Sequence, residues 1–190
     1  SDAAAGHRSG FACFVGRPNA GKSTLMNALV GEKVAIMSSR PQTTRRAIRG
    51  IVTRSDAQVV VVDTPGLHRP RTLLGERLND LVRETFADVD VIGFCLPADE
   101  KVGPGDQWIA KELADARAPV VAIVTKVDKV SRERVAEHLL AVSELGDWAD
   151  IVPVSSVKGI QVDVLLDVLI RHLPEGPPLY PSGEVTDEPE

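Results

Sequence analysis

The sequence predicts an α/β fold built on a mixed, mostly parallel sheet of six strands with helices on both faces. Apolar, β-branched runs alternate with segments of helical periodicity along most of the chain, which is the pattern of a parallel sheet buried on both faces. One pair of strand-like runs is joined by too few residues for a crossover helix, so this pair must be antiparallel. A length of 190 residues suits one domain with a substantial core.

Each element follows from one of these two patterns. The expected strands are residues 11–15, 47–52, 59–62, 91–96, 120–124 and 151–154. Residues 53–58 form the short connection of the expected hairpin, between the second and third of these strands. The expected helices, in which apolar residues recur near the spacing of one helix face, are residues 24–30, 74–86, 107–116, 132–145 and 162–173.

The composition is that of an ordinary globular protein, with 43% hydrophobic and 26% charged residues. No apolar stretch reaches the length of a membrane span, and the N-terminus lacks a signal-peptide pattern. Cys13 and Cys95 lie in apolar runs, so we expect two reduced core thiols and neither a disulfide nor a metal site. The net charge of −5 argues against strong nucleic-acid binding by this chain as a whole.

Charge is unevenly distributed along the chain. Residues 38–54 contain five arginines and no acid, whereas residues 174–190 contain five acids, five prolines and no Lys or Arg. The second composition predicts a linker and not a packed element. We expect residues 1–9 to be disordered or left over from cloning, and residues 10–173 to form the domain.

The strongest motif directly follows the first strand. Residues 16–23 are Gly-Arg-Pro-Asn-Ala-Gly-Lys-Ser, a full match to GxxxxGKS, and a helical segment follows them. The two glycines let backbone amides point inward and, together with the helix N-terminus, hold a β-phosphate. Lys22 reaches the β- and γ-phosphates, and the Ser23 hydroxyl ligates Mg²⁺. The strand and helix on either side make a chance glycine turn a poor alternative, so we expect a nucleoside-phosphate site.

A second motif ends the third strand. Asp63-Thr64-Pro65-Gly66 is DxxG, and Asp63 lies at the carboxyl end of a strand, where ligands bind in sheets of this type. Asp63 is expected to hold Mg²⁺ through water, and the Gly66 amide to donate to the γ-phosphate. A lone DxxG is usually a simple turn, but its position behind a P-loop favours the functional interpretation.

Two further motifs predict selectivity for guanine. Thr125-Lys126-Val127-Asp128 follows the fifth strand, and Asp128 can accept from guanine N1–H and the 2-amino group, a pair that adenine lacks. The Lys126 stem can pack across the base. After the last strand, the backbone amides of residues 155–157 can donate to guanine O6. An ATPase of similar fold is the competing interpretation, which Asp128 opposes.

Residues 41–45, Pro-Gln-Thr-Thr-Arg, lie between the first helix and the hairpin. A threonine here can ligate Mg²⁺ and donate its amide to the γ-phosphate, and Thr44 is favoured over Thr43. We expect the γ-phosphate to order residues 31–49 and 64–78, and its loss to release them. Their arginines are either a solvated face or a surface that reports the nucleotide state.

These motifs, in this order and spacing, resemble those of the translation-factor-related GTPases, and in detail those of the Era family of bacterial ribosome-assembly GTPases. The matching stretches are Gly-Arg-Pro-Asn-Ala-Gly-Lys-Ser-Thr-Leu, Pro-Gln-Thr-Thr-Arg-Arg, Val-Asp-Thr-Pro-Gly-Leu-His, Ile-Val-Pro-Val-Ser-Ser and Arg-His-Leu-Pro-Glu-Gly. The resemblance covers about residues 10–190. It implies a P-loop NTPase fold of the Ras-like G-domain type and hydrolysis of GTP to GDP and phosphate.

The resemblance also implies partners. Family members continue with a KH domain that binds the 3′ end of small-subunit ribosomal RNA, and nothing in this chain is similar to that domain. We therefore expect the GTPase half of such a protein, with residues 174–190 as the linker and weak or no RNA binding by this chain alone. We also expect a cytoplasmic monomer, with peripheral association of the full protein with the inner face of the cell membrane.

Three positions qualify the resemblance. Thr125 stands where NKxD has asparagine, so a tether between base pocket and P-loop is expected to weaken, whereas Ser156 in place of alanine is expected to matter little. Leu67 stands where Ras-like proteins place a water-orienting glutamine, and His68 lies one residue late. Slow hydrolysis follows, and Leu67 favours the alternative of a nucleotide-dependent binding module with negligible turnover.

Asn19 favours an enzyme over that alternative, because the resemblance implies that this residue ligates a potassium ion in place of an arginine finger. The competing role of Asn19 is that of an ordinary turn residue. The Arg17 side chain, at the start of the P-loop, is expected to face solvent.

Three sets of site residues result from these arguments. The residues expected to contact GTP or GDP are Gly16, Arg17, Pro18, Asn19, Ala20, Gly21, Lys22, Ser23, Thr24, Asp63, Thr64, Pro65, Gly66, Leu67, Thr125, Lys126, Asp128, Ser155, Ser156 and Val157. The expected Mg²⁺ ligands are Ser23, Thr44 and Asp63. The expected catalytic residues are Asn19, Lys22, Thr44 and Gly66.

Overall fold

The computed structural model describes residues 6–31, 47–64 and 73–181, of which residues 73–79 and 81 are described by their backbone alone. Its elements, in chain order, are β1 (Arg8–Val15), α1 (Lys22–Val30), β2 (Ile48–Arg54), β3 (Ala57–Val62), α2 (Leu73–Asp88), β4 (Val91–Pro97), α3 (Pro104–Leu113), β5 (Val120–Thr125), the 3₁₀ turn η3 (Val127–Lys129), α4 (Arg132–Ser143), β6 (Asp150–Pro153) and α5 (Val162–Arg171). Every strand and helix expected from the sequence is present within a few residues of its predicted bounds.

A single sheet of six strands forms the centre of the molecule, in the order β2-β3-β1-β4-β5-β6. β2 pairs antiparallel with β3, and all other neighbours are parallel. The predicted mixed, mostly parallel sheet is therefore confirmed, as is the hairpin. Every residue of β3, β4 and β5 is buried, which explains why these strands lack an alternating pattern.

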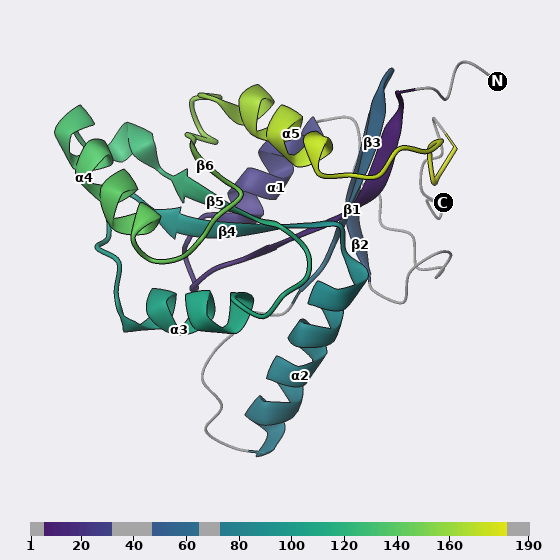
Figure 1. The fold of residues 1–190 in the computed structure, drawn as a ribbon. Helices are drawn as coiled ribbons and strands as arrows, with labels where there is room; N and C mark the ends of the chain where they lie inside the picture. The colour runs from purple at the N-terminus through teal and green to yellow at the C-terminus, as the bar shows by residue number, and fades with distance from the viewer. Residues whose placement is uncertain (1–5, 32–46, 65–72, 182–190) are drawn as a thin grey trace, which may run out of the picture.

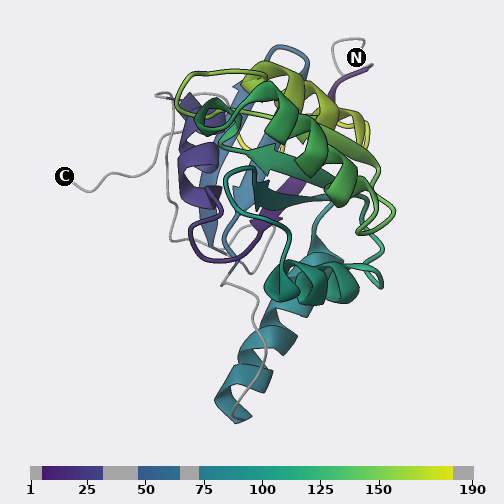
Figure 2. The same ribbon diagram turned by 90° about the vertical axis from the view of Figure 1, so that its left-hand side faces the viewer.

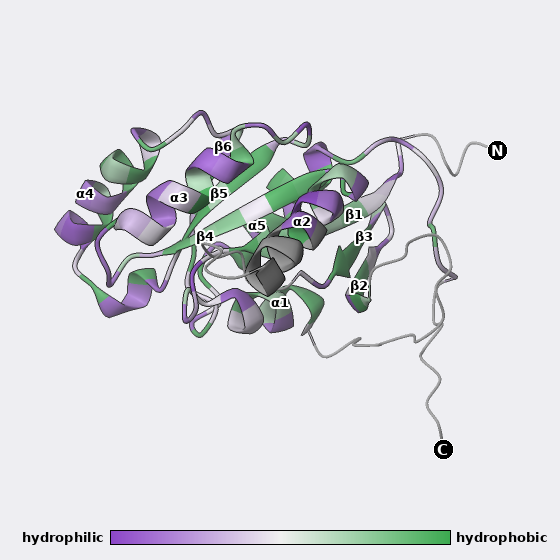
Figure 3. Ribbon diagram, turned by 90° about the horizontal axis from the view of Figure 1, so that it is seen from below, coloured by the Kyte–Doolittle hydropathy of each residue, from purple (hydrophilic) through white to green (hydrophobic). Residues whose placement is uncertain are grey.

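Helices cover both faces of the sheet (Figure 1). On one face, α1 and α5 pack leucines such as Leu25, Leu165 and Leu169 against the strands. On the other face, α2, α3 and α4 contribute Phe86, Ile109 and Val142 to a second cluster. Figure 3 shows the result in hydropathy, with hydrophobic strands between helices that carry hydrophilic segments. In Figures 1 and 2 one end of α2 projects well beyond the sheet.

The first strand begins earlier than the sequence suggests. β1 starts at Arg8, and both His7 and Ser9 are buried, so the expectation that the chain lies outside the fold up to residue 9 is wrong for these residues. The Ser9 amide donates to Pro174 O at 3.1 Å, and the Gly176 amide donates to His7 O at 2.8 Å. The polar segment at residues 7–9 therefore joins the fold because residues 174–176 provide partners for its backbone hydrogen bonds.

The same contacts correct the interpretation of the tail. Residues 174–181 pack against the sheet, although their composition predicted a linker. The fully buried Gln58 accepts from the amides of Leu179 and Tyr180 at 2.8 and 3.0 Å and donates to Tyr180 O at 2.9 Å. The Tyr180 ring packs with Ile48 and Val60. Composition failed here because one buried carboxamide supplies the hydrogen bonds that proline-rich backbone cannot supply itself.

Both cysteines are free and fully buried, as expected. Burial raises the pKa of each thiol to about 12, so both stay protonated at neutral pH. Within the described ranges, none of the helices combines the length and the apolar character that a bilayer crossing needs.

Candidate functional site

The motifs found in the sequence meet at one edge of the sheet. β1, β3, β5 and β6 run parallel, so their carboxyl ends lie together. The P-loop follows β1, Asp63 follows β3, Lys126 follows β5 and Val154 follows β6. This edge is where ligands bind in open α/β sheets, because helix N-termini and loops converge there.

The P-loop is a compact turn that opens directly into α1. Asn19 and Gly21 adopt left-handed conformations, with φ of 67° and 95°, and the Ala20 amide donates to Arg17 O at 3.1 Å. A Cβ at Gly16 would lie 2.8 Å from Cys95 O of β4, so only glycine fits there. The Leu25 amide bonds to Gly21 O at 2.9 Å, which starts the helix. The N-terminus of α1 therefore faces the same edge as the other motifs.

Lys22, the first residue of α1, folds back over the loop. Its Nζ donates to Gly16 O at 2.8 Å. Burial lowers the pKa of the Lys22 ammonium, and the nearby Asp63 carboxylate partly opposes that shift. A partly desolvated cation at a helix N-terminus is stabilised when an anion binds beside it.

A cavity of about 370 Å³ opens over this loop. It is lined by Asn19, Gly21, Lys22, Ser23, Thr24 and Lys126. The cavity thus joins the P-loop to a residue of the proposed base motif, and its volume lies in the range of small-molecule sites.

Two hydrogen bonds connect the base motif directly to the P-loop. Thr125 Oγ1 donates to Ala20 O at 2.7 Å, and Lys126 Nζ donates to Asn19 O at 2.8 Å. Threonine at position 125 therefore does make a tether to the P-loop. The short hydroxyl reaches the carbonyl because β5 ends right beside the loop, and Thr125 is only 2% exposed.

Asp128 is exposed in η3 and is oriented by a neighbour. Its Oδ1 accepts from Ser155 Oγ at 2.8 Å, and the same Ser155 Oγ accepts from the Lys158 amide at 3.1 Å. Ser155 is fully buried, whereas Ser156 is half-buried and Val157 is exposed. The sequence predicted a backbone role for Ser155; the structure adds a side-chain role, namely to hold the Asp128 carboxylate.

Two of the predicted magnesium ligands lie at this edge. Ser23 is exposed at the start of α1, and Asp63 is half-exposed after β3, with Oδ1 3.7 Å from Arg49 Nη1. A hydroxyl and a carboxylate are the hard oxygen donors that Mg²⁺ prefers. Residues 6–31, 47–64 and 73–181 contain no group of three or more His, Cys, Asp or Glu that could hold a metal. This donor set fits an ion that takes its other ligands from phosphate and water.

Some predicted residues lie outside the described part of the chain. These are Thr43, Thr44, Pro65, Gly66, Leu67 and His68. Thr64 is described, and its hydroxyl donates to Phe14 O at 3.0 Å.

The Arg17 side chain does not face solvent as expected. Its Nε donates to Asp106 Oδ1 at 2.7 Å, and its Nη1 donates to Glu100 Oε1 at 2.8 Å. Asp106 is only 1% exposed. Sequence reasoning missed both partners because neither lies in a nucleotide motif.

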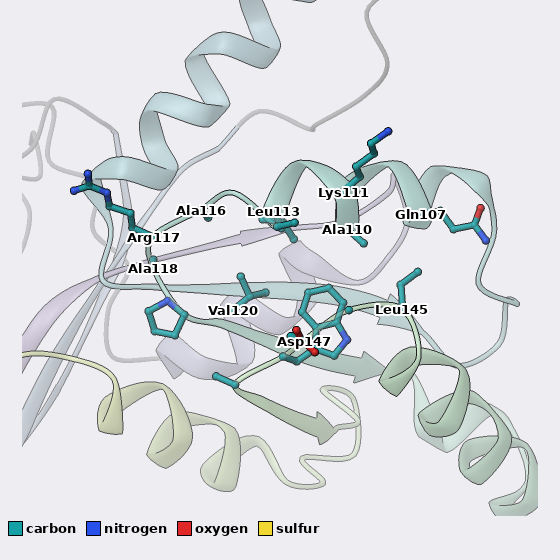
Figure 4. A pocket seen from close by; sticks show the side chains of 15 residues that line it. Gln107, Ala110, Lys111, Leu113, Ala116, Arg117, Ala118, Val120, Leu145 and Asp147 are labelled. Carbon is teal, nitrogen blue, oxygen red and sulfur yellow. The ribbon is translucent and has the colours of Figure 1, made fainter.

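A second cavity, of about 730 Å³, lies at the opposite edge of the sheet (Figure 4). It is bounded by α3, by residues 116–120 and by residues 145–149, and Val120 and Ala149 mark the amino ends of β5 and β6. Its walls include Ala110, Leu113 and Leu145. It contains none of the residues singled out from the sequence, so the nucleotide motifs point to the smaller cavity.

The comparisons with known proteins agree with this geometry. A family model described as 50S ribosome-binding GTPase matches residues 11–126. GTPase Era of Streptomyces coelicolor is 68% identical over 190 residues, which cover 97% of this chain and 60% of that protein. The chain thus spans about three fifths of the length of this relative.

Two solved structures are similar in fold. A point variant of Aquifex aeolicus Era bound to GDP.AlF4- is 34% identical with a TM-score of 0.79, covering 96% of this chain and 62% of that one. Era in complex with MgGDPNP and nucleotides 1506–1542 of 16S ribosomal RNA is 33% identical with a TM-score of 0.81, covering 96% and 63%. This similarity confirms the predicted P-loop fold of the G-domain type.

Proposed function

The chain belongs to the 50S ribosome-binding GTPase family, within which it is similar to the Era GTPases, and we propose that it is the guanine-nucleotide switch of such a protein. It binds GTP and GDP at the carboxyl edge of the sheet and hydrolyses GTP to GDP and phosphate. The observation that carries this proposal is the pair of hydrogen bonds from Thr125 and Lys126 to the P-loop carbonyls. These bonds hold the proposed base-binding loop beside the phosphate-binding loop. A nucleotide, which carries a base and phosphates in one molecule, needs both loops close together.

Each side chain has a distinct task in this site. The amides of the P-loop and the N-terminus of α1 hold the phosphates, and Lys22 adds a charge-assisted contact. Asp128, fixed by Ser155, accepts from the guanine edge, and the amides of residues 155–157 donate to O6. Ser23 and Asp63, with Thr44, would hold Mg²⁺, which would neutralise phosphate charge.

Hydrolysis in this proposal depends on positioning and charge. Lys22 and the loop amides stabilise the charge that develops during phosphoryl transfer. The Leu67 side chain has no carboxamide with which to orient the attacking water, so intrinsic GTP turnover is slow. Asn19 lines the cavity, and we propose that it holds a potassium ion that supplies additional positive charge.

The remaining proposals concern the longer protein. Residues 182–190 lead to a KH domain that binds the 3′ end of small-subunit ribosomal RNA, and the switch serves assembly of that subunit. Support comes from the complex of the similar Era structure with 16S ribosomal RNA. We further propose that the protein is a cytoplasmic monomer whose association with the cell membrane is peripheral.

The test compares guanine and adenine nucleotides on the wild-type chain. Calorimetry with Mg²⁺ is expected to give tight GDP binding and no comparable ADP binding. A matched pair of variants tests the phosphate site: Lys22→Ala weakens GDP binding about 10- to 100-fold, the range for a hydrogen bond to a charged group, whereas Lys111→Ala on α3 leaves it unchanged. Equal affinity for ADP and GDP refutes the base assignment. Tight GTP binding without phosphate release supports the binding module instead.

A further inference from the structure

The side chain of Arg17 connects the P-loop to a part of the molecule that carries no nucleotide motif. Its two partners are Asp106, in the first turn of α3, and Glu100, in the loop between β4 and α3. The donor–acceptor distances of 2.7 and 2.8 Å are those of charge-assisted hydrogen bonds.

Asp106 is a rigid partner because its two oxygens have separate tasks. Oδ2 accepts from the Gly103 amide at 3.0 Å and thereby caps α3, while Oδ1 accepts from Arg17. The carboxylate also lies in the first turn of the helix, where a negative charge is favourable. At 1% exposure, this carboxylate depends on Arg17 for a neutralising charge.

The arginine stem passes very close to α3. A Cβ at Gly105 would lie 2.9 Å from Arg17 Cδ, so the glycine leaves just the space that the stem needs. Arg17 Nη2 is buried as well, with no hydrogen-bond partner in the described ranges. A planar guanidinium with two separate contacts, enclosed in this way, is not reproduced by lysine.

The backbone of Arg17 closes the P-loop turn, because its carbonyl accepts from the Ala20 amide at 3.1 Å. Three other carbonyls of the loop are held by motif residues: Gly16 O by Lys22, Asn19 O by Lys126 and Ala20 O by Thr125. Arg17 O, in contrast, belongs to a residue whose own side chain is anchored to α3 through Asp106.

We propose that Arg17, paired with Asp106 and Glu100, is a positioning residue that fixes the P-loop turn in its phosphate-binding conformation. The proposal rests on the proposed function, since it concerns the affinity of that site. A loop that is held in its bound conformation loses less entropy when the nucleotide binds. Releasing the Arg17 anchor therefore weakens nucleotide binding without removing any group that touches the phosphates.

The experiment measures GDP affinity by calorimetry for Arg17→Gln, Asp106→Asn and the double variant, each first shown to be folded by circular dichroism. Each single variant is expected to weaken GDP binding about tenfold, equivalent to about 1.4 kcal/mol. The double variant is expected to bind GDP no more weakly than whichever single variant binds it less tightly, because both substitutions remove the same contact between Arg17 and Asp106. In steady-state GTP turnover, the fall in kcat/KM is expected to come mainly from a higher KM and less from a lower kcat.

Arg83 provides a matched control. It also bridges α3 to a neighbouring element, donating to Glu112 at 2.7 Å and to Asp80 at 3.0 Å, but it lies on α2, away from the P-loop. Arg83→Gln is expected to leave GDP affinity unchanged. If burial of Asp106 makes the first two variants unfold, Glu100→Gln tests the exposed end of the anchor, with an expected loss of about two- to threefold, as for a partly exposed ion pair.

Three outcomes overturn the inference: a folded Arg17→Gln protein with wild-type GDP affinity, additive losses in the double variant, or an equal loss in Arg83→Gln. Wild-type GDP affinity in a folded Glu100→Gln protein counts against it in the same way. A wild-type chain that binds no GDP at all refutes the proposed function and this inference together.

Discussion

Asp128 illustrates how much a single side chain decides in the proposed site. Ser155 Oγ donates to one of its oxygens at 2.8 Å, yet each carboxylate oxygen has two acceptor positions, so three remain and a guanine edge needs two of them. The carboxylate is oriented before the base arrives. Base selectivity therefore depends on the charge state and donor pattern of this one group.

Asp128→Asn is expected to shift the preference from GTP towards xanthosine triphosphate, because the new amide donates to the xanthine 2-oxo group. The loss for GTP is about 10- to 100-fold, the range for loss of hydrogen bonds to a charged group. Competition binding measures the shift. Asp147→Asn, in the loop before β6, is the control and keeps the wild-type preference. Normal GTP affinity in Asp128→Asn shows that the base pocket is misassigned.

Asn19 is the residue on which the proposed potassium dependence rests. Potassium is expected to accelerate GTP turnover several-fold over sodium at equal ionic strength, because a cation held by Asn19 would stabilise the charge of the transition state. Asn19→Ala is expected to abolish the difference between the salts, measured as phosphate release. Equal wild-type rates in the two salts indicate that this charge comes from another source.

Among the elements, the tail is the one whose packing alters the proposed domain boundary. Residues 174–181 are hydrogen-bonded to β1 and to Gln58 of β3, and Tyr180 contacts Ile48 at the start of β2. β2 is the first element after the segment that contains Thr44. Tyr180 of the tail thus lies beside β2. This strand follows the segment that contains Thr44, which is proposed to respond to the nucleotide.

Tyr180→Ala is expected to lower the free energy of unfolding by about 2 kcal/mol, since the ring is 6% exposed and truncation of a buried aromatic leaves a cavity. Chemical denaturation with urea measures this change. The adjacent Leu179, at 37% exposure, is the matched control, and Leu179→Ala is expected to cost less than about 1 kcal/mol. Equal effects of the two variants contradict a tail that is held by Tyr180.

On the scale of the whole molecule, charge sets the expected partners. The net charge is −5, while the five arginines of residues 38–54 lie close together in the sequence. Contacts between cationic side chains and phosphates dominate nucleic-acid affinity. A chain with a net negative charge therefore lacks the main electrostatic attraction that tight binding needs.

This chain alone is therefore expected to bind RNA weakly and with strong salt dependence. A gel-shift titration against the 3′ end of small-subunit ribosomal RNA measures this at physiological salt. Replacing the arginines at positions 49 and 54 by glutamine is expected to weaken what binding remains, because each substitution eliminates a candidate phosphate contact. Tight, sequence-specific binding by these 190 residues contradicts the proposed division of labour.

The sequence by itself determined the fold class, the antiparallel hairpin and the identity of the nucleotide motifs. These follow from hydrophobic period and from glycine, lysine and carboxylate spacing, which are properties of neighbouring residues. The edge at which the motifs meet also followed, because parallel strands bring their carboxyl ends together. The positions of Thr44 and Gly66 at this edge remain predictions, since both residues lie outside the described ranges.

The tertiary structure alone decided which distant side chains hold these motifs in place. Arg17 finds its partners 83 and 89 residues away, and Gln58 binds a tail 121 and 122 residues further along the chain. Thr125, expected to weaken a tether, makes one at 2.7 Å because β5 ends beside Ala20. Such contacts depend on how elements pack, and a short polar side chain or a proline-rich segment carries no local signal of the partner that packing will bring to it.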